Sequence, residues 1–169
     1  MEIVNKIQAS GIITLDLEQY YPAGERVLID LRENLYMGLI LKEKEFRDYI
    51  KTNDWQEFAN KYVAITCTAD AIVPTWAYML VASKLNGIAK KVVFGNLDTL
   101  ETILLLENLH KHINSQDYHN AKLVIKGCSK IKISEAAYVE ITNMLLPHVQ
   151  SLMFGEPCST VPVFKKPKL

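Results

Sequence analysis

The amino-acid sequence predicts an α/β protein: a single three-layer domain over residues 1–169, with a mixed, mostly parallel sheet of about five or six strands flanked by helices. Short apolar runs, typical of strands buried on both faces, alternate with helix-like segments through the last two-thirds of the chain. That alternation is the order of parallel crossover units. The chain has 169 residues, of which 49% are hydrophobic and 22% charged, a composition typical of a globular domain.

The first forty residues are typical of strands joined by turns. Residues 11–17 and 26–31 are strand candidates, and residues 20–26 between them form a turn rich in Pro and Gly. Residues 35–41 are expected to follow as a hairpin partner of the second strand. We expect these strands to extend the sheet by antiparallel pairing. Residues 42–61 are mostly helical, because their apolar and charged positions fall on opposite sides of a helix.

From about residue 61 the alternation becomes regular, and it shows no internal repeat and no Gly/Ser/Pro-rich linker. Pro74 suits the first turn of its helix and Gly87 the end of that helix, Ser134 is the expected N-cap of the last helix, and Pro147 is expected to kink it. The segments are, in order, strand 62–67, helix 74–87, strand 90–96, helix 98–113, strand 121–128, helix 134–154 and strand 160–166.

Composition and missing motifs argue against several functional classes. Lys and Arg total 19, as do Asp and Glu, so no net charge attracts nucleic acid. The longest uncharged stretch, residues 71–83, contains a proline and is too short to span a bilayer, and the N-terminus lacks the apolar core of a signal peptide. Motifs of nucleotide-binding loops and of the common hydrolases are absent. The sequence therefore predicts a cytoplasmic protein that binds neither nucleic acid nor membranes, and it leaves homo-oligomerisation open.

Three cysteines mark the candidate site. Cys67 and Cys128 each end a predicted parallel strand, at the sheet edge where ligands bind in open α/β sheets. Cys158 precedes the last strand, so it reaches the same edge if that strand is antiparallel or if its loop crosses over the edge. In a reducing compartment such thiols are buried apolar residues, metal ligands or reactive groups.

Each cysteine is followed by a hydroxyl residue, namely Thr68, Ser129 and Ser159. Hydroxyl donors stabilise a neighbouring thiolate, so we assign these three residues to tuning a bound cofactor. The first functional hypothesis is a site for zinc or an iron–sulfur cluster. The three cysteines supply thiolate ligands, and Asp70 or solvent fills a fourth position. No CxxC pair accompanies this set.

Two alternatives stay open at this stage, and whether the protein is an enzyme is not decided. The first is an enzyme or sulfur carrier that uses one activated thiol, either Cys128 or Cys158. The second is a non-catalytic interaction module in which the cysteines only pack. Asp70 also suits the free amides of a nearby helix N-terminus, and Trp76 and Tyr78 either wall a pocket or pack in the core.

Several segments together resemble a known bacterial family. The motifs "CTADAIVPTWAYM" and "GEPCSTVP" are the most specific, and they are joined by "KKVVFGNLDTLE", "KLVIKGC" and "AYVEIT". With these segments the chain resembles, over essentially its whole length, the family catalogued as domain of unknown function 2480. The resemblance implies a single-domain cytoplasmic protein, and it assigns no reaction and no residue role.

Overall fold

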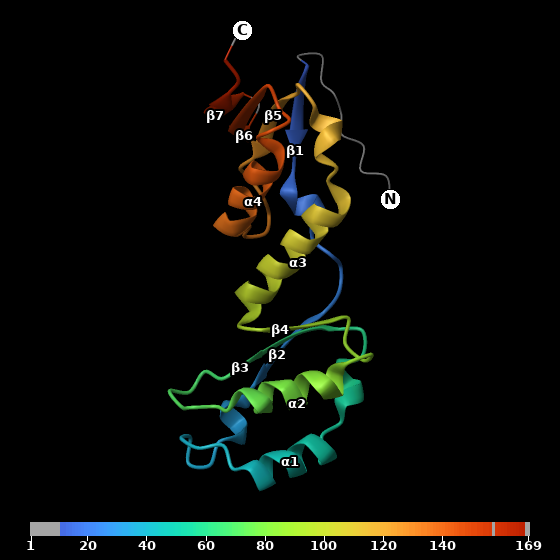
Figure 1. The fold of residues 1–169 in the computed structure, drawn as a ribbon, viewed down its shortest axis with the longest axis vertical. Coiled ribbons are helices and arrows are strands. Elements are labelled where there is room, and N and C mark those ends of the chain that lie inside the picture. The colour runs from blue at the N-terminus through green and yellow to red at the C-terminus, as the bar shows by residue number, and fades with distance from the viewer. Residues whose placement is uncertain (1–10, 157, 168–169) are drawn as a thin grey trace. The chain divides into compact units, whose positions relative to one another are not determined.

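The chain folds into two compact units. The computed structural model describes residues 11–156 and 158–167, and it divides into unit 1, made of Met1–Pro22 and Thr102–Leu169, and unit 2, Ala23–Glu101. Unit 2 is thus inserted, in sequence, between the first strand of unit 1 and the remainder of that unit (Figure 1). Among the described residues, no helix combines the length and the apolar character needed to cross a bilayer.

Unit 2 contains a three-stranded parallel sheet in the order β2-β3-β4. Its strands are Arg26–Asp30, Tyr62–Thr66 and Lys91–Phe94, and the connecting helices are α1 (Glu43–Thr52) and α2 (Thr75–Leu85). Both crossovers step in the same direction along the sheet, so right-handed connections put both helices on one side of it (Figure 1). The core between this side and the helices is apolar and includes Ile29, Phe46, Trp55, Val63, Ile65 and Val81.

The described residues of unit 1 form a four-stranded sheet in the order β1-β5-β6-β7, in which only β7 is antiparallel to its neighbour. Helices α3 (Leu97–His112) and α4 (Glu135–Leu145) contribute to one apolar cluster with the strands, around Leu15, Leu109 and Ile141. The strands are β1 (Ile12–Leu15), β5 (Lys122–Lys126), β6 (Ser151–Glu156) and β7 (Ser159–Lys165).

Short 3₁₀ helices adjoin the strands of both units. In each of them an Asp or Asn side chain at the N-cap accepts a hydrogen bond from the backbone N–H two residues further on, which satisfies an amide that the short helix leaves free. They are η1 (Leu17–Tyr20, capped by Asp16), η2 (Leu31–Asn34, capped by Asp30), η3 (Trp55–Phe58, capped by Asp54) and η4 (Ser115–Tyr118, capped by Asn114).

The two units repeat one arrangement of elements. From β3 to the end of β4, each position of unit 2 corresponds to the position 60 residues later in unit 1, so that β3, which starts at Tyr62, corresponds to β5, which starts at Lys122. Helices α2 and α4 keep the same spacing, and each buries an alanine fully, Ala77 and Ala137. The residues before the repeated strands, Asn60 and Asn120, both have positive φ, 62° and 56°. The sequence-based expectation that the chain contains no internal repeat is therefore wrong.

Aromatic packing repeats as well. Tyr78 packs edge-on against Phe94 with ring centroids 5.1 Å apart, and at the same spacing Tyr138 packs edge-on against Phe154 at 5.4 Å; both interplanar angles are 84°. The conserved features are caps, backbone conformations and packing positions, which many different side chains satisfy. The two copies therefore share little sequence, and the repeat is visible mainly in the structure.

The predicted class is confirmed, since mostly parallel strands are flanked by helices. The prediction of one sheet is wrong, because the strands form two sheets of four and three. The expected antiparallel pairing of the N-terminal strands is also wrong: β1 is parallel to β5 and β2 is parallel to β3. Each N-terminal strand is the first strand of a crossover unit, in which a helix, not a hairpin, leads to its partner. The three-layer arrangement and the single domain over residues 1–169 stay predictions.

Two predicted elements also differ from the structure. Residues 35–41 form no strand; they contain an isolated bridge between Tyr36 and Ile40, with positive φ at Met37 and Gly38. The last predicted helix, 134–154, ends at Leu145, and β6 then begins at Ser151. Pro147 explains this second difference, because it lacks the N–H that would continue the helix, and it ends the helix where a kink was expected.

Candidate functional site

Two of the three cysteines lie at the same end of the unit 1 sheet. Lys126, the last residue of β5, is opposite Gly155 in the parallel strand β6, and Cys128 follows two residues later. Cys158 lies in the connection from β6 to β7. Because β7 returns antiparallel, this connection is at the carboxyl ends of β5 and β6. The antiparallel condition for bringing Cys158 to this edge is thus confirmed, and both thiols belong to exposed residues.

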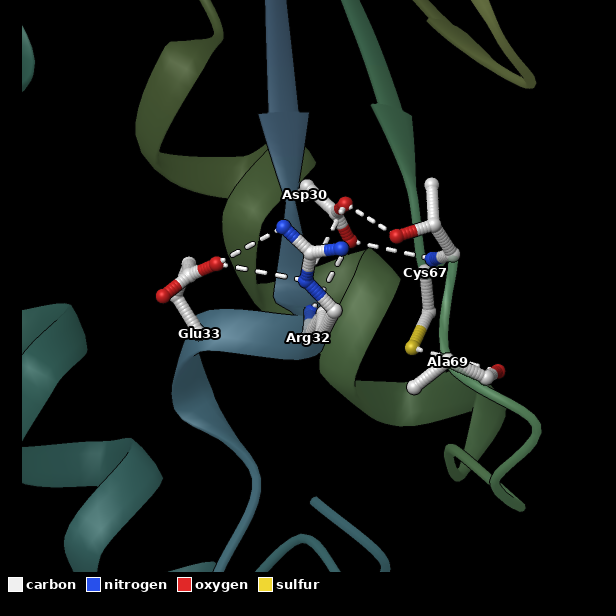
Figure 2. A network of polar contacts seen from close by, with 6 residues as sticks. Asp30, Arg32, Glu33, Cys67 and Ala69 are labelled. Carbon is white, nitrogen blue, oxygen red and sulfur yellow. Dashed lines mark hydrogen bonds and ion pairs between the residues drawn. The ribbon is translucent and has the colours of Figure 1, made fainter.

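Cys67 belongs to unit 2 and has a different environment. It follows β3, is partly buried, and its sulfur is 3.9 Å from the carbonyl oxygen of Ala69, to which the thiol donates (Figure 2). Cys67 also packs against the apolar core of unit 2. Its thiol is therefore less available than those of the two exposed cysteines.

The hydroxyl of Thr68 donates a hydrogen bond to the carboxylate of Asp30, the last residue of the neighbouring strand β2. The Thr68 backbone N–H donates to Asp30 Oδ1 at 3.0 Å, and its hydroxyl donates to Oδ2 at 2.5 Å. The Arg32 amide also donates to Oδ1, at 3.0 Å. Burial alone would raise the pKa of Asp30, but the hydrogen bonds from Thr68 and Arg32 hold this pKa below its ordinary value.

The other predicted ligands and tuning residues are distributed over both units. Asp70 is exposed in the β3–α2 connection of unit 2 and lines a shallow hollow with Ile40 and Ile72. In unit 1 the Ser129 hydroxyl donates to the Ile131 carbonyl oxygen at 2.5 Å, and the exposed Ser159 begins β7.

Over the part of the chain that the structure describes, no three His, Cys, Asp or Glu side chains are grouped as metal ligands. Cys67 and Asp70 belong to unit 2, whereas Cys128 and Cys158 belong to unit 1. Metal binding by these four residues therefore stays a prediction, as does cofactor tuning by the three hydroxyl residues.

A charged pair lies at the carboxyl edge of the unit 1 sheet. Asp16, directly after β1, accepts a hydrogen bond from Lys126 Nζ at 2.7 Å, with 17% and 32% of the two side chains exposed. This hydrogen bond raises the pKa of Lys126, and the charges of Glu156 and Glu18 raise it further. Glu156 also has a buried carboxylate oxygen without a hydrogen-bond partner among the described residues.

Tyr138, on α4, interacts electrostatically both with Asp16 of this charged pair and with Cys128. Burial raises the pKa of its phenol, and the negative charges of Asp16 and of the Cys128 thiolate raise it further. Tyr138 is therefore protonated near neutral pH, and its hydroxyl is a hydrogen-bond donor within electrostatic reach of the Cys128 sulfur.

An apolar hollow of about 340 Å³ opens beside Tyr138. The Thr142 hydroxyl donates to the Tyr138 carbonyl oxygen at 2.7 Å, so this hydroxyl proton is already used within α4. Glu135, in the first turn of α4, is the charged residue of the lining. The hollow is lined by β5, α4, β6 and β7, through residues that include Ile125, Val139, Leu152, Met153, Phe154 and Val163.

Comparison of the two units shows why this site forms in unit 1. At the 60-residue spacing, Cys128 occupies the position of Thr68, and Gly127 that of Cys67. A β-carbon on Gly127 would lie 2.9 Å from a ring carbon of Phe154, so the glycine admits this ring to the strand end. In the described part of unit 2, β4 is an edge strand, whereas β7 covers β6 in unit 1.

Sequence reasoning missed the importance of Asp16, Lys126 and Tyr138. A signal was present: "LDL" at residues 15–17 and "IDL" at 29–31 end the first strand of each unit. The pair "AY" likewise recurs in α2 and α4. Recognising these matches would have aligned the units and pointed to the carboxylate at each strand end.

Fold and site together define an α/β protein of two repeated units, one inserted into the sequence of the other, with two exposed thiols at one sheet edge of unit 1. The chain belongs to the family described as Protein of unknown function (DUF2480), whose model matches residues 1–166. This confirms the resemblance noted in the sequence. No curated protein and no solved structure matches the chain.

Proposed function

We propose that the protein acts through a reactive thiol, with Cys128 as the nucleophile, at the carboxyl edge of the unit 1 sheet. The observation that carries this proposal is the exposure of Cys128 two residues after the end of β5. The charges of Asp16 and Cys128 also raise the pKa of Tyr138 on α4. A thiol reacts as its thiolate, and hydrogen-bond donors and positive charge at a site favour that form. The Tyr138 hydroxyl is the donor that we propose for this site, since the charge of Cys128 acts on its phenol.

The second exposed thiol supports the same assignment. Cys158 is in the connection at the same end of the sheet as Cys128, so a second sulfur is available at this edge. The reducing cytoplasm predicted from the sequence keeps both thiols free for reaction. Cys67, at the neighbouring position of the repeat, is partly buried and donates to a carbonyl, and it therefore serves as an internal comparison.

The experiment is a competition of the three cysteines for a limiting amount of iodoacetamide near neutral pH. Peptide mass spectrometry then gives the alkylated fraction at each position. We expect Cys128 to react fastest, at least about tenfold faster than Cys67 and faster than free glutathione. Cys128→Ser removes the fast phase, and Cys67→Ser is the matched control that leaves it unchanged. Uniformly slow alkylation of all three thiols would refute the proposal.

A further inference from the structure

The apolar hollow adjoins the proposed thiol site through Phe154, and Tyr138, which lines the hollow, is electrostatically coupled to Cys128. Tyr138 lines the hollow and its phenol is within electrostatic reach of the Cys128 sulfur. Phe154 lines the hollow as well, and its ring approaches Gly127, the residue directly before Cys128. The hollow and the thiol are therefore parts of one surface region, formed by the ends of β5 and β6 and the first turns of α4.

The chemistry of the hollow indicates what it can bind. Its lining is almost entirely hydrocarbon, and its volume of about 340 Å³ is at the lower end of the range for small-molecule sites. Val139 is 60% exposed and Val163 is 54% exposed, so a ligand that covers them removes apolar surface from water. An unbranched acyl chain or a small aromatic group fits this lining, whereas a charged or sugar-like group would leave its polar atoms without partners.

We propose that the hollow binds the hydrocarbon part of the compound that reacts at Cys128, and that this compound is an acyl thioester. The inference rests on the proposed function of Cys128 and adds the substrate class to it. Acyl transfer to a thiol uses a nucleophile and a hydroxyl donor for the oxyanion, and the adjoining apolar hollow fits a hydrocarbon acyl chain. Tyr138 is the residue that donates to the developing oxyanion.

The step balances without an oxidant or a reductant. The Cys128 thiolate attacks the thioester carbonyl carbon, a new carbon–sulfur bond forms, and the carbonyl electron pair moves to the oxygen, which the Tyr138 hydroxyl stabilises. The bond from that carbon to the departing sulfur then breaks. The departing thiolate takes a proton from water, and the acyl group remains on Cys128 as a new thioester.

The repeat supplies a matched pair of variants for the test. Val139→Asp puts a charge into the hollow, and Met79→Asp puts the same charge at the corresponding position of α2 in unit 2. Both native residues are exposed, 60% and 66% respectively, so neither change buries a charge in a core. Tyr138→Phe keeps the ring in the lining and removes only the hydroxyl.

The full-length protein is incubated with S-acetyl- or S-octanoyl-N-acetylcysteamine, and acylation of Cys128 is followed by intact and peptide mass spectrometry. We expect the octanoyl compound to react at least about tenfold faster, since burial of only two additional methylene groups gives a preference of this size. Val139→Asp should remove most of this preference and Met79→Asp should leave it. Tyr138→Phe should slow both acylations by about 100-fold or more without changing octanoyl binding.

Binding is measured separately from reaction, so that the two proposals fail in different ways. In Cys128→Ser, methyl NMR signals of Val139 and Val163 should shift on addition of S-octanoyl-N-acetylcysteamine and not of the acetyl compound. Absence of these shifts would overturn the assignment of the hollow, whatever the thiol does. Fast alkylation of Cys128 by iodoacetamide with equal acetyl and octanoyl rates would overturn the substrate class and leave the reactive thiol intact. Slow alkylation would refute the reactive thiol itself.

Discussion

Replacement of Gly155 by alanine should damage the β6–β7 edge that carries Cys158. Gly155 has φ +124°, and a β-carbon there would lie 2.5 Å from the carbonyl oxygen of Ser159. The backbone conformation alone costs roughly 1–3 kcal/mol for a residue other than glycine. The close approach adds a cost of about 1–3 kcal/mol, because the atom in contact is backbone and cannot rotate away. We expect Gly155→Ala to lower the free energy of unfolding by about 2–6 kcal/mol.

Gly11→Ala is the matched control within the same unit. Gly11 also has positive φ, +67°, but nothing lies within 4 Å of its added β-carbon, so its cost is about 1–2 kcal/mol from backbone strain alone. Urea unfolding followed by circular dichroism gives the two free energies, and amide hydrogen exchange of β6 and β7 localises the change. Equal losses in the two variants, or unchanged exchange in β7 of Gly155→Ala, would refute the steric argument.

Three further predictions concern titration, the charged pair and metal content. Burial, with a smaller contribution from Tyr118, raises the pKa of Tyr20 to about 12, so the folded state holds the phenol proton more tightly than the unfolded state. The resulting stabilisation is complete below about pH 10, and roughly 2–3 kcal/mol of it should be lost by about pH 12. Urea unfolding measured against pH should detect this loss, and Tyr20→Phe should abolish it. Asp16→Asn should lower the pKa of Lys126 toward its ordinary value, because the hydrogen bond and charge of Asp16 are the main cause of its increase. NMR titration of the lysine side chain measures this pKa, and an unchanged value would contradict the prediction. Protein purified without oxygen should carry less than about one metal ion per ten chains if the thiol proposal holds, whereas about one zinc or iron–sulfur cluster per chain, lost on replacement of the cysteines by serine, would establish the metal hypothesis instead.

The helices and strands of the fold were largely predictable from the sequence, whereas the pairing of the strands was less so. Apolar runs such as residues 62–66 and 122–126 have strand character on their own, and Pro74 and Ser134 mark helix starts. The one long error, the extension of the last helix to residue 154, arose because Leu152 continues a helical apolar spacing although it belongs to β6. Short apolar segments satisfy helix and strand periodicity equally, and only their tertiary partners decide between the two.

The candidate site was predictable in part. The positions of Cys67 and Cys128 at strand ends follow from strand order, because carboxyl ends of parallel strands share one edge. Which cysteines share a unit did not follow, because it depends on β1 pairing with β5, across 79 residues of unit 2 (Ala23–Glu101). Contacts over such separations leave no local signal in the sequence.

By itself, the sequence determined the α/β class, the alternation of strands and helices, and the family, because these depend on local periodicity and on residue identity along the chain. Only the tertiary structure decided that the strands form two sheets in repeated units, that β7 returns antiparallel and keeps Cys158 at the carboxyl edge of the unit 1 sheet, and that Tyr138 lines an apolar hollow while interacting electrostatically with Cys128. The physical reason is that pairing, burial and electrostatic reach are properties of residues brought together in space, and their positions along the chain do not specify them.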